Sequence, residues 1–319
     1  MKPIVLSMGD PAGIGPELIA ATWRALEGSI PFVVVGCAAQ MEAQEAPVAR
    51  ITKLSDLPPN ALPVLDHPLP SAPTPGVPDP AHAPHIIDWI QKGVALCQIG
   101  EASALATAPI NKKALMEGAG FTFPGHTEFL AALTGAPRPV MMLTGGGLRV
   151  VPVTIHIALD AVQETLTEPL LEETIRVTHR ALRETYGIAN PRLAVAGLNP
   201  HAGEQGAMGR EEITLIAPVL ERLRAEGFDL HGPLPADTMF HDRARTKYDV
   251  ALCMYHDQAL IPIKTLAFDE GVNVTLGLPI VRTSPDHGTA YDIAGKGIAR
   301  PDSLIAAIRE AALIAQARA

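Results

Sequence analysis

Three histidines follow apolar runs that have the composition of buried strands. His156 ends VVPVTIH, His201 follows LAVAGLNP, and His256 follows VALCMY. In open α/β sheets the carboxyl ends of the strands form the ligand crevice, so imidazoles that follow such strands could meet there. Neutral imidazole binds zinc, cobalt or nickel, and three protein ligands leave positions open for substrate. The pattern predicts a divalent-metal site. The alternative is three unrelated histidines, because their wide spacing forms no local ligand motif.

Other side chains near these runs could bind an anion. FPGHTEFLA places His126 and Thr127 at a helix start, where Thr127 or backbone amides could hold an anion, although Thr127 could equally be an ordinary N-cap. Lys264 in KTLAF and Arg282 in PIVRTS lie near strand-like segments and could be phosphate donors rather than solvated charges. Asn273 in GVNVTLG could add a neutral donor.

The elements that would position these residues alternate along the chain. Apolar runs bounded by turn residues predict strands at 2–8, 31–36, 103–109, 148–156, 192–200, 248–255 and 272–279. Helical periodicity predicts helices at 16–28, 85–97, 168–187, 211–227 and 302–319. Residues 57–84 are rich in proline and are expected to be loop or edge structure. This alternation predicts an α/β fold with largely parallel sheets.

Composition narrows the class of protein. The 319 residues are 47% hydrophobic and 18% charged, which is typical of a globular chain of one or two domains. The net charge of −9 argues against a nucleic-acid-binding surface, although a small phosphorylated ligand needs only a few donors. No apolar run is long enough for a membrane span, and the N-terminal residues do not resemble a signal peptide. Three separated cysteines are expected to be buried, reduced thiols, so a cytoplasmic protein is expected.

Seven blocks follow one another in order from Gly9 to Gly297, namely GDPAGIGPE, APINKKAL, FPGHTEFLA, GLNPHAGEQGAMGREE, PADTMF, YHDQALIPIK and VNVTLGLPIVRTSPDHGTAYDIAGKG. Together they resemble one family, the 4-hydroxythreonine-4-phosphate dehydrogenases of vitamin B6 biosynthesis. The region from about Pro58 to Gly100 matches poorly. HGTAYDIAGKGIARP is also similar to a block of the isocitrate and isopropylmalate dehydrogenases, which use NAD or NADP and a divalent metal on a fold that is not the Rossmann fold.

The resemblance implies a role for each group of candidate residues. The metal ligands would be His156, His201 and His256, the last of which could come from a second subunit. The substrate would be held by His126, Thr127, Lys264, Asn273 and Arg282. The cofactor would lie near Gly13, Gly15, His287, Gly288, Thr289 and Asp292.

The implied reaction needs NAD or NADP and one divalent ion, which would be zinc, magnesium or cobalt. It would oxidise 4-phosphohydroxy-L-threonine at its 3-hydroxyl, and decarboxylation would then give 3-amino-2-oxopropyl phosphate. Three residues are candidates for the general base, namely Asp237, Asp257 and Lys264, the last only if burial lowers its pKa. Asp257 could instead orient a metal-bound imidazole.

Three alternatives to this activity stay open. A related dehydrogenase would act on 4-phospho-D-threonate or D-erythronate 4-phosphate. A metal-dependent phosphohydrolase would use the histidines and the Lys/Arg pair, but it would not need HGTAYDIAGKG. A ligand-binding protein without catalytic activity would keep the phosphate donors alone.

The resemblance also predicts the organisation of the molecule. Two α/β/α domains with a cleft between them are expected, as in isocitrate and isopropylmalate dehydrogenases and unlike a classical Rossmann fold. The first would comprise residues 1–134 plus 281–319, and the second, 135–280, would carry most metal and substrate residues. A homodimer that shares its site between subunits is expected, with no nucleic-acid or membrane partner.

Overall fold

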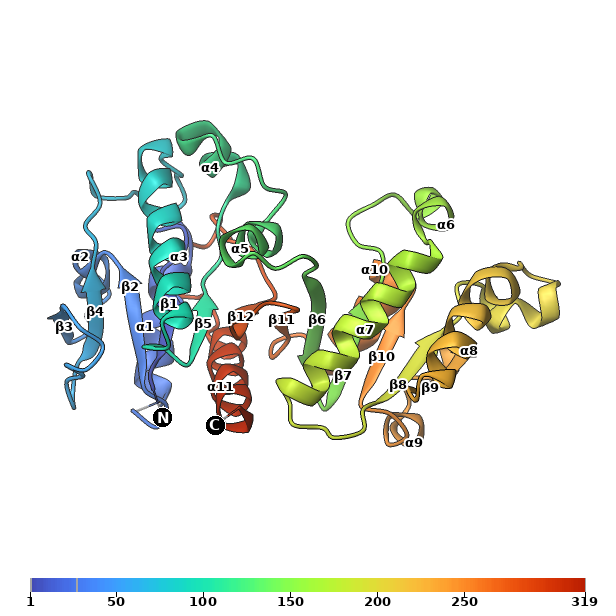
Figure 1. Ribbon diagram of the computed structural model, residues 1–319. Helices are drawn as coiled ribbons and strands as arrows, with labels where there is room; N and C mark the ends of the chain where they lie inside the picture. The colour runs from blue at the N-terminus through green and yellow to red at the C-terminus, as the bar shows by residue number, and fades with distance from the viewer. Residues whose placement is uncertain (1, 27, 319) are drawn as a thin grey trace. The chain divides into compact units, whose positions relative to one another are not determined.

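The chain forms two α/β units in the computed structural model, which describes residues 2–26 and 28–318 (Figure 1). The first unit comprises the chain up to Pro139 together with Leu278–Ala317, and the second comprises Val140–Gly277. The division expected from the sequence, at residues 134 and 281, lies a few residues from these bounds. The α/β fold class is confirmed, whereas the cleft between domains stays a prediction.

The first unit is built on a parallel sheet with strand order β3-β4-β2-β1-β5-β12. Its strands are β1 (Ile4–Ser7), β2 (Phe32–Gly36), β3 (Val48–Ile51), β4 (Leu62–Asp66), β5 (Ala104–Thr107) and β12 (Arg282–Pro285). The residues of β1, β2, β5 and β12 are all buried, which is expected when helices cover both faces of a parallel sheet.

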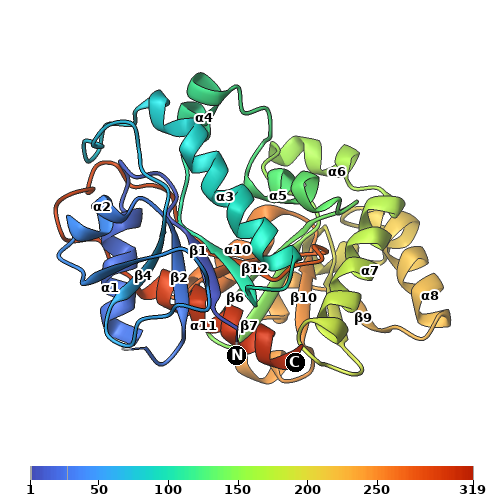
Figure 2. The ribbon, with the colours of Figure 1, turned by 60° about the vertical axis from the view of Figure 1, so that its left-hand side comes forward.

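The helices of the first unit lie on both sides of this sheet. They are α1 (Gly15–Leu26), α2 (Ala38–Glu42), the short η1 (Pro80–His82), α3 (Ala83–Gln98), α4 (Lys112–Ala119), α5 (His126–Thr134) and α11 (Asp302–Ala317). Helix α3 packs on β1, β2 and β5, whereas α11 packs on β12, β5 and α1. Figure 2 shows α3 and α11 on opposite sides of the strands.

The second unit has a mixed sheet with strand order β11-β6-β7-β10-β8-β9. Its strands are β6 (Val140–Gly145), β7 (Leu148–Pro152), β8 (Arg192–Ala196), β9 (Asp229–Leu234), β10 (Val250–Cys253) and β11 (Val272–Leu276). Strand β6 is antiparallel to both β11 and β7, while β7, β10, β8 and β9 are mutually parallel. The expectation of largely parallel sheets therefore holds for the part of this sheet that carries the histidines.

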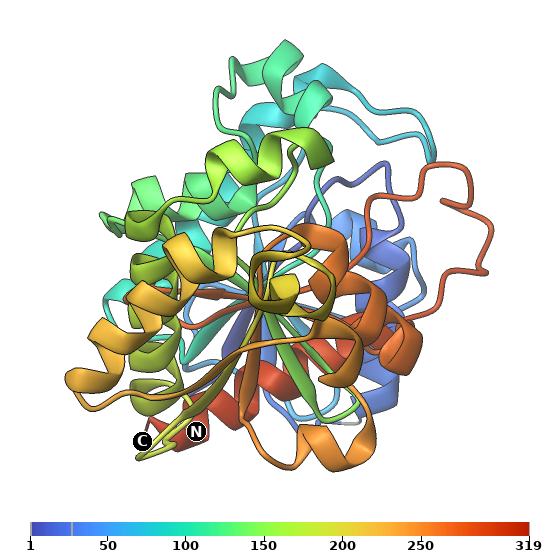
Figure 3. The same ribbon diagram turned by 90° about the vertical axis from the view of Figure 1, so that its right-hand side faces the viewer.

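Helices flank the mixed sheet as well. They are η2 (Leu159–Ala161), α6 (Val162–Thr165), α7 (Glu168–Glu184), η3 (Pro200–Gly206), the π-helical η4 (Glu212–Ile216), α8 (Ala217–Ala225), η5 (Ala236–Thr238), α9 (Asp242–Arg245) and α10 (His256–Ala267). Helix α7 packs on β6, β11 and α8, whereas α10 packs on β6, β7 and β10. The two helices lie on opposite sides of the strands in Figure 3.

Two local expectations were wrong, and proline explains both. Lys264 lies inside helix α10 and not beside a strand. Because this helix contains Pro262, its sequence gives no clear helical signal. The proline-rich segment contains β4, which is not an edge strand, because β2 and β3 pair with it on either side. Pro63 within β4 had argued against an inner strand.

Two further expectations concern membrane spans and the cysteines. None of the helices in the described residues is both long and apolar enough to cross a bilayer. All three cysteines are free thiols; Cys37 and Cys253 are buried, and Cys97 is half-buried. Burial raises the pKa of the Cys97 thiol to about 12, so this thiol is unreactive at neutral pH.

Candidate active site

The three histidines predicted to bind metal follow the carboxyl ends of neighbouring parallel strands. His156 comes after β7, His201 after β8, and His256 is the first residue of α10 directly after β10. Strand β10 lies between β7 and β8 and is parallel to both, so all three segments leave the same edge of the sheet. The backbone at His156 and His201 is left-handed, with φ of 52° and 51°. Such backbone at non-glycine residues is concentrated at functional sites.

Two of these imidazoles are close together. The ring centroids of His156 and His256 are 5.6 Å apart, and both rings line a cavity of about 530 Å³. Asp257 Oδ1 lies 2.7 Å from His256 Nδ1, an arrangement that fixes a metal-binding imidazole in many proteins. His201 does not join them, because residues 2–26 and 28–318 contain no group of three His, Cys, Asp or Glu side chains placed to hold a metal. The donor chemistry fits a divalent ion, and two of the three predicted ligands lie close together within one chain.

Gln258 links the ends of β8 and β10, the strands that precede His201 and His256. Its Oε1 accepts a hydrogen bond from Met254 N at 2.7 Å, and its Nε2 donates to Gly197 O at 2.8 Å. The side chain is buried, so both bonds form away from water. The amide therefore fixes the end of β8 against the end of β10. The sequence showed Gln258 beside His256 but gave no sign of this link.

A second polar group lies in the first unit. Arg282 begins β12, and its Nη2 donates to Thr107 Oγ1 at 2.7 Å at the end of neighbouring β5. The guanidinium is only 3% exposed, and burial lowers its pKa to about 10, so it stays charged at pH 7. A buried cation at a strand end can bind an anionic substrate group.

His126 and Lys112 join this group. His126 is the first residue of α5 and follows the N-cap Gly125, so Thr127 is not the N-cap. His126 and Lys112 line a cavity of about 140 Å³ together with Thr107 and Ser284. In the part of the chain that the structure describes, the buried His126 Nε2 has no hydrogen-bond partner. A ligand that enters this cavity could therefore complete a hydrogen bond that the protein leaves unmade.

The prediction from sequence omitted Lys112. The residue opens helix α4, which Asn111 caps by accepting a hydrogen bond from Ala114 N at 3.0 Å. The only available signal was its position in APINKKAL, one of the seven family blocks, where two adjacent lysines read as ordinary surface charge. Its place in the cavity depends on the approach of its side chain to Gly125, the N-cap of α5, where an added Cβ would lie 3.6 Å from Lys112 Cε. Local spacing does not predict this approach.

The titration of His126 should be visible in the stability of the protein. Burial, and next the charges of Arg282 and Lys112, lower the pKa of His126 well below its ordinary value. As pH falls through about 6.5, the unfolded chain takes up a proton at this residue and the folded chain does not, so unfolding becomes easier. We expect His126→Asn to reduce the loss of unfolding free energy between pH 7 and pH 5, by up to about 1.4 kcal/mol per pH unit.

Urea unfolding of both proteins across this pH range measures the effect. His241→Asn is the matched control, because His241 is an exposed histidine. Identical pH profiles for the parent protein and His126→Asn would contradict the expectation.

The predicted cofactor residues also lie in the first unit, and some of them meet. Ile14 N donates to Thr289 O at 3.0 Å, and a Cβ added at Gly13 would lie 2.8 Å from the same oxygen. Gly13 is therefore required by close backbone approach, and Gly15 begins α1 directly after it. His287 and Gly288 line the same cavity as His126. Asp292 is exposed.

Asp10 and Tyr291, which the sequence did not single out, join these two segments. Asp10 Oδ1 accepts from Ala12 N at 2.9 Å, and Tyr291 donates its hydroxyl hydrogen bond to Asp10 Oδ2 at 2.5 Å. The first and last family blocks of the sequence thus pack against each other. Burial, followed by the hydrogen bond to Asp10, raises the pKa of Tyr291.

The remaining candidates lie in the second unit. Lys264 Nζ is 5.4 Å from the Phe268 ring centroid in α10, and Asn273 is half-buried in β11. Asp237 lies in η5 and is exposed, as is Asp257. Among the candidate bases, Asp257 is hydrogen-bonded to His256, which is a predicted metal ligand.

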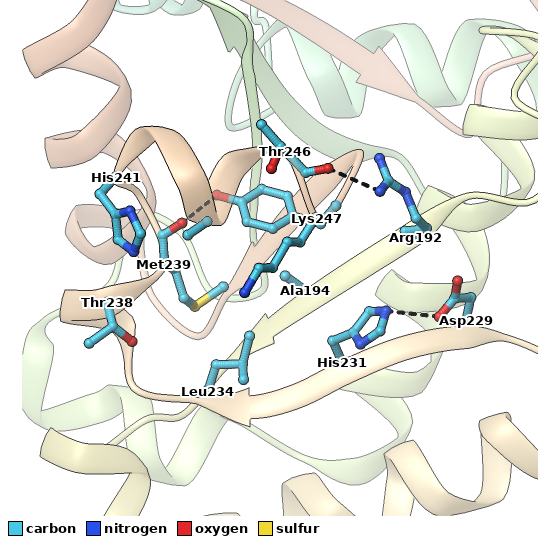
Figure 4. A pocket seen from close by; sticks show the side chains of 12 residues that line it. Arg192, Ala194, Asp229, His231, Leu234, Thr238, Met239, His241, Thr246 and Lys247 are labelled. Carbon is cyan, nitrogen blue, oxygen red and sulfur yellow. Dashed lines mark hydrogen bonds and ion pairs between the residues drawn. The ribbon is translucent and has the colours of Figure 1, made fainter.

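The second unit also has a larger cavity, of about 810 Å³, between β8, β9 and α9 (Figure 4). His231 is paired with Asp229 at 2.9 Å at one side, and Tyr248 donates to Met239 O at 2.9 Å on the other. None of the residues predicted from the sequence lines this cavity, although Thr238 follows Asp237 directly. Its lining is mainly apolar, and it does not share residues with the histidine cavity.

Comparison with known proteins supports the family resemblance that the seven sequence blocks indicate. A family model described as pyridoxal phosphate biosynthetic protein PdxA matches residues 19–311. The chain is 58% identical to the 4-hydroxythreonine-4-phosphate dehydrogenase of Roseobacter denitrificans, over 98% of this chain and 97% of that protein. It is 57% identical to the enzyme of that name from Caulobacter vibrioides, over 99% and 98%. A crystal structure of the Klebsiella pneumoniae enzyme of that name is similar, with a TM-score of 0.92 and 43% identity over 99% of this chain and 98% of that one. The chain therefore belongs to the pyridoxal phosphate biosynthetic protein PdxA family.

Proposed function

We propose that the chain is a 4-hydroxythreonine-4-phosphate dehydrogenase that works in vitamin B6 biosynthesis. It would oxidise 4-phosphohydroxy-L-threonine at the 3-hydroxyl, and the 3-oxo acid would lose carbon dioxide to leave 3-amino-2-oxopropyl phosphate. Family membership supports the reaction. The observation that carries the substrate class is the buried Arg282 guanidinium, which is hydrogen-bonded to Thr107 in the wall of the cavity that His126 and Lys112 line.

This cavity suits an anionic group of the substrate. Arg282 stays charged at pH 7, Lys112 adds a second positive charge, and His126 is neutral there because its pKa is lowered. A neutral imidazole can still donate one hydrogen bond through an N–H. Two cations and a neutral donor match a phosphate better than an uncharged hydroxyl group. Thr127, Asn273 and Lys264 would complete the contacts to the substrate.

Two bound groups would supply the redox chemistry. Gly13, Gly15, His287, Gly288, Thr289 and Asp292 would hold a nicotinamide, NAD or NADP, which would supply the hydride acceptor. A divalent ion such as zinc, magnesium or cobalt would supply Lewis-acid chemistry at the substrate. His156, His201 and His256 would hold that ion.

The chain itself must take the hydroxyl proton. Asp237, Asp257 and Lys264 are the candidates. Asp257 is hydrogen-bonded to His256 Nδ1, so we assign to Asp257 the role of orienting that imidazole. Asp237 and Lys264 are then the two candidates for the general base. In this scheme the base would take the hydroxyl proton, the hydride of C3 would go to the bound cofactor, and a proton would replace the departing carbon dioxide.

The proposal includes a homodimer that shares the site. His201 lies outside the pair formed by His156 and His256, so a second copy would complete the ligand set, with His256 as the ligand that it would donate. The cavity of that pair is bordered by exposed apolar side chains, namely Ile157 at 40%, Leu159 at 73% and Ile261 at 64% exposure. Exposed apolar residues that gather at one place are typical of an interaction surface. We propose a cytoplasmic location for this dimer.

Turnover in the presence of NAD or NADP tests the proposal. Metal-loaded protein should produce absorbance in the reduced-nicotinamide band with 4-phosphohydroxy-L-threonine, and a chelator should abolish it. Turnover of 4-phospho-D-threonate or D-erythronate 4-phosphate alone would keep the mechanism and change the substrate. Release of inorganic phosphate without cofactor reduction would point instead to a phosphohydrolase.

A further inference from the structure

The segment that carries His201 has an unusual backbone. Five successive residues, His201 to Gln205, have φ of 51°, 51°, 75°, 41° and 56°. Only Gly203 among them lacks a Cβ, and each other residue in this left-handed region costs roughly 1 kcal/mol or more. A left-handed turn of this length persists only if neighbouring groups hold it. We call residues 201–205 the left-handed turn.

Asn199 connects this turn to a buried carboxylate. Asn199 N donates to Glu212 Oε1 at 2.7 Å, and Asn199 Nδ2 donates to Glu212 Oε2 at 3.0 Å and to Glu211 Oε2 at 2.7 Å. Asn199 O in turn accepts from Ala202 N, inside the turn, at 3.1 Å. One short path of hydrogen bonds thus runs from Glu212 through Asn199 into the residue next to His201.

Glu212 is unusual as well, because it is only 3% exposed. Within the ranges that the structure describes, no Lys, Arg or His forms an ion pair with it. Carboxylates are rarely buried without a cation, since burial removes the hydration of the charge. Both of its oxygens are instead occupied by Asn199, which indicates that holding Asn199 is the role of this side chain.

Two glycines near the left-handed turn are required because Glu212 and Asn199 approach their backbone closely. A Cβ added at Gly203 would lie 2.5 Å from Glu212 Oε2, and one added at Gly209 would lie 2.3 Å from Asn199 Nδ2. Both glycines also have positive φ, 75° and 128°. The spacing of Gly, Asn and Glu in GLNPHAGEQGAMGREE therefore follows from close packing of the turn on Glu212 and Asn199.

We propose that Glu212 is a positioning residue for the metal centre, and that it acts through Asn199 to hold the left-handed turn in the conformation that presents His201. The inference rests on the proposed function, in which His201 is a ligand. Glutamine at position 212 has one acceptor oxygen and would place an N–H₂ group against the N–H₂ of Asn199. The turn would then lose a bond and gain a repulsion without loss of volume.

Cobalt binding tests the proposal without an activity assay. Metal-free dimer of the parent protein, Glu212→Gln and Glu221→Gln would be titrated with Co²⁺ by equilibrium dialysis, and the d–d absorption of the bound ion recorded. Glu221 is an exposed residue of α8 and is the matched control. We expect Glu212→Gln to bind Co²⁺ about 10- to 100-fold more weakly, with an altered spectrum, and Glu221→Gln to match the parent.

The outcomes separate positioning from support of the fold. Equal Co²⁺ affinity in the parent and the folded Glu212→Gln protein would overturn the inference, even if the variant melts earlier. If Glu212→Gln does not fold, Asn199→Ala decides, because it removes the side-chain bonds to Glu212 and Glu211 and keeps the backbone bond. Weaker Co²⁺ binding by folded Asn199→Ala supports the inference, and unchanged binding overturns it. A parent protein that binds no Co²⁺ would remove the proposed metal site itself.

Discussion

Arg282→Met is expected to lower kcat/KM for 4-phosphohydroxy-L-threonine by roughly two to three orders of magnitude, mainly through KM. The guanidinium is buried, charged and fixed by Thr107, so its loss removes a charge-assisted contact that no water can replace. Removing one partner of such a buried pair costs about 2–5 kcal/mol. The unbranched methionine side chain replaces much of the aliphatic part of arginine, which limits the change in packing around β5 and β12.

The measurement compares two substrates. The parent protein and Arg282→Met would be assayed with the phosphorylated compound and with 4-hydroxy-L-threonine, which lacks the phosphate. A phosphate contact predicts a large effect on the first substrate and a small one on the second. Equal effects on both would show that Arg282 does not bind the phosphate. Arg300→Met, which alters an exposed arginine, serves as the control.

His201→Ala is expected to abolish chelator-sensitive turnover, a loss of about three orders of magnitude or more, while the chain stays folded. A divalent ion contributes several kcal/mol of charge stabilisation to reactions of this kind, and each 1.4 kcal/mol corresponds to a factor of ten in rate. His201 is exposed, so its truncation leaves no cavity in the core.

Steady-state rates at increasing Co²⁺ concentration, together with circular dichroism, measure this effect. His231→Ala is a suitable control, because His231 is an exposed histidine of β9 that pairs with Asp229. Full activity of His201→Ala would remove this residue from the metal site. A loss of activity that excess Co²⁺ restores would assign His201 to metal affinity alone.

The sequence was sufficient for the parts of the site that depend on strand order. His156, His201 and His256 each follow a buried apolar run, and segments after parallel strands leave the same edge of a sheet. Strand order does not predict that His156 and His256 come close together while His201 stays apart. The runs themselves are visible as β-branched and apolar residues between turn signals, so the strands β7, β8 and β10 could be predicted with the residues that leave them.

The rest of the site depends on contacts between distant segments. Arg282 is buried because β12 pairs with β5, and Thr107, its partner, lies 175 residues away. Lys112 lines the cavity because of the way in which α4 is packed. Glu212 reaches Asn199 because the left-handed turn brings the two residues together. No local pattern encodes a left-handed turn at His201, since its residue types are ordinary for a helix or loop.

The discontinuous first unit has a consequence for synthesis on the ribosome. Strand β12 and helix α11, both from the last part of the chain, pair with β5 and pack on β1. The residues up to Pro139 therefore lack one strand and one helix of their unit until Leu278–Ala317 has been synthesised. Val140–Gly277 is continuous and can fold as soon as it emerges. We expect ribosome-bound chains that end near Gly277 to contain a protease-resistant second unit, while the N-terminal segment is still open to cleavage.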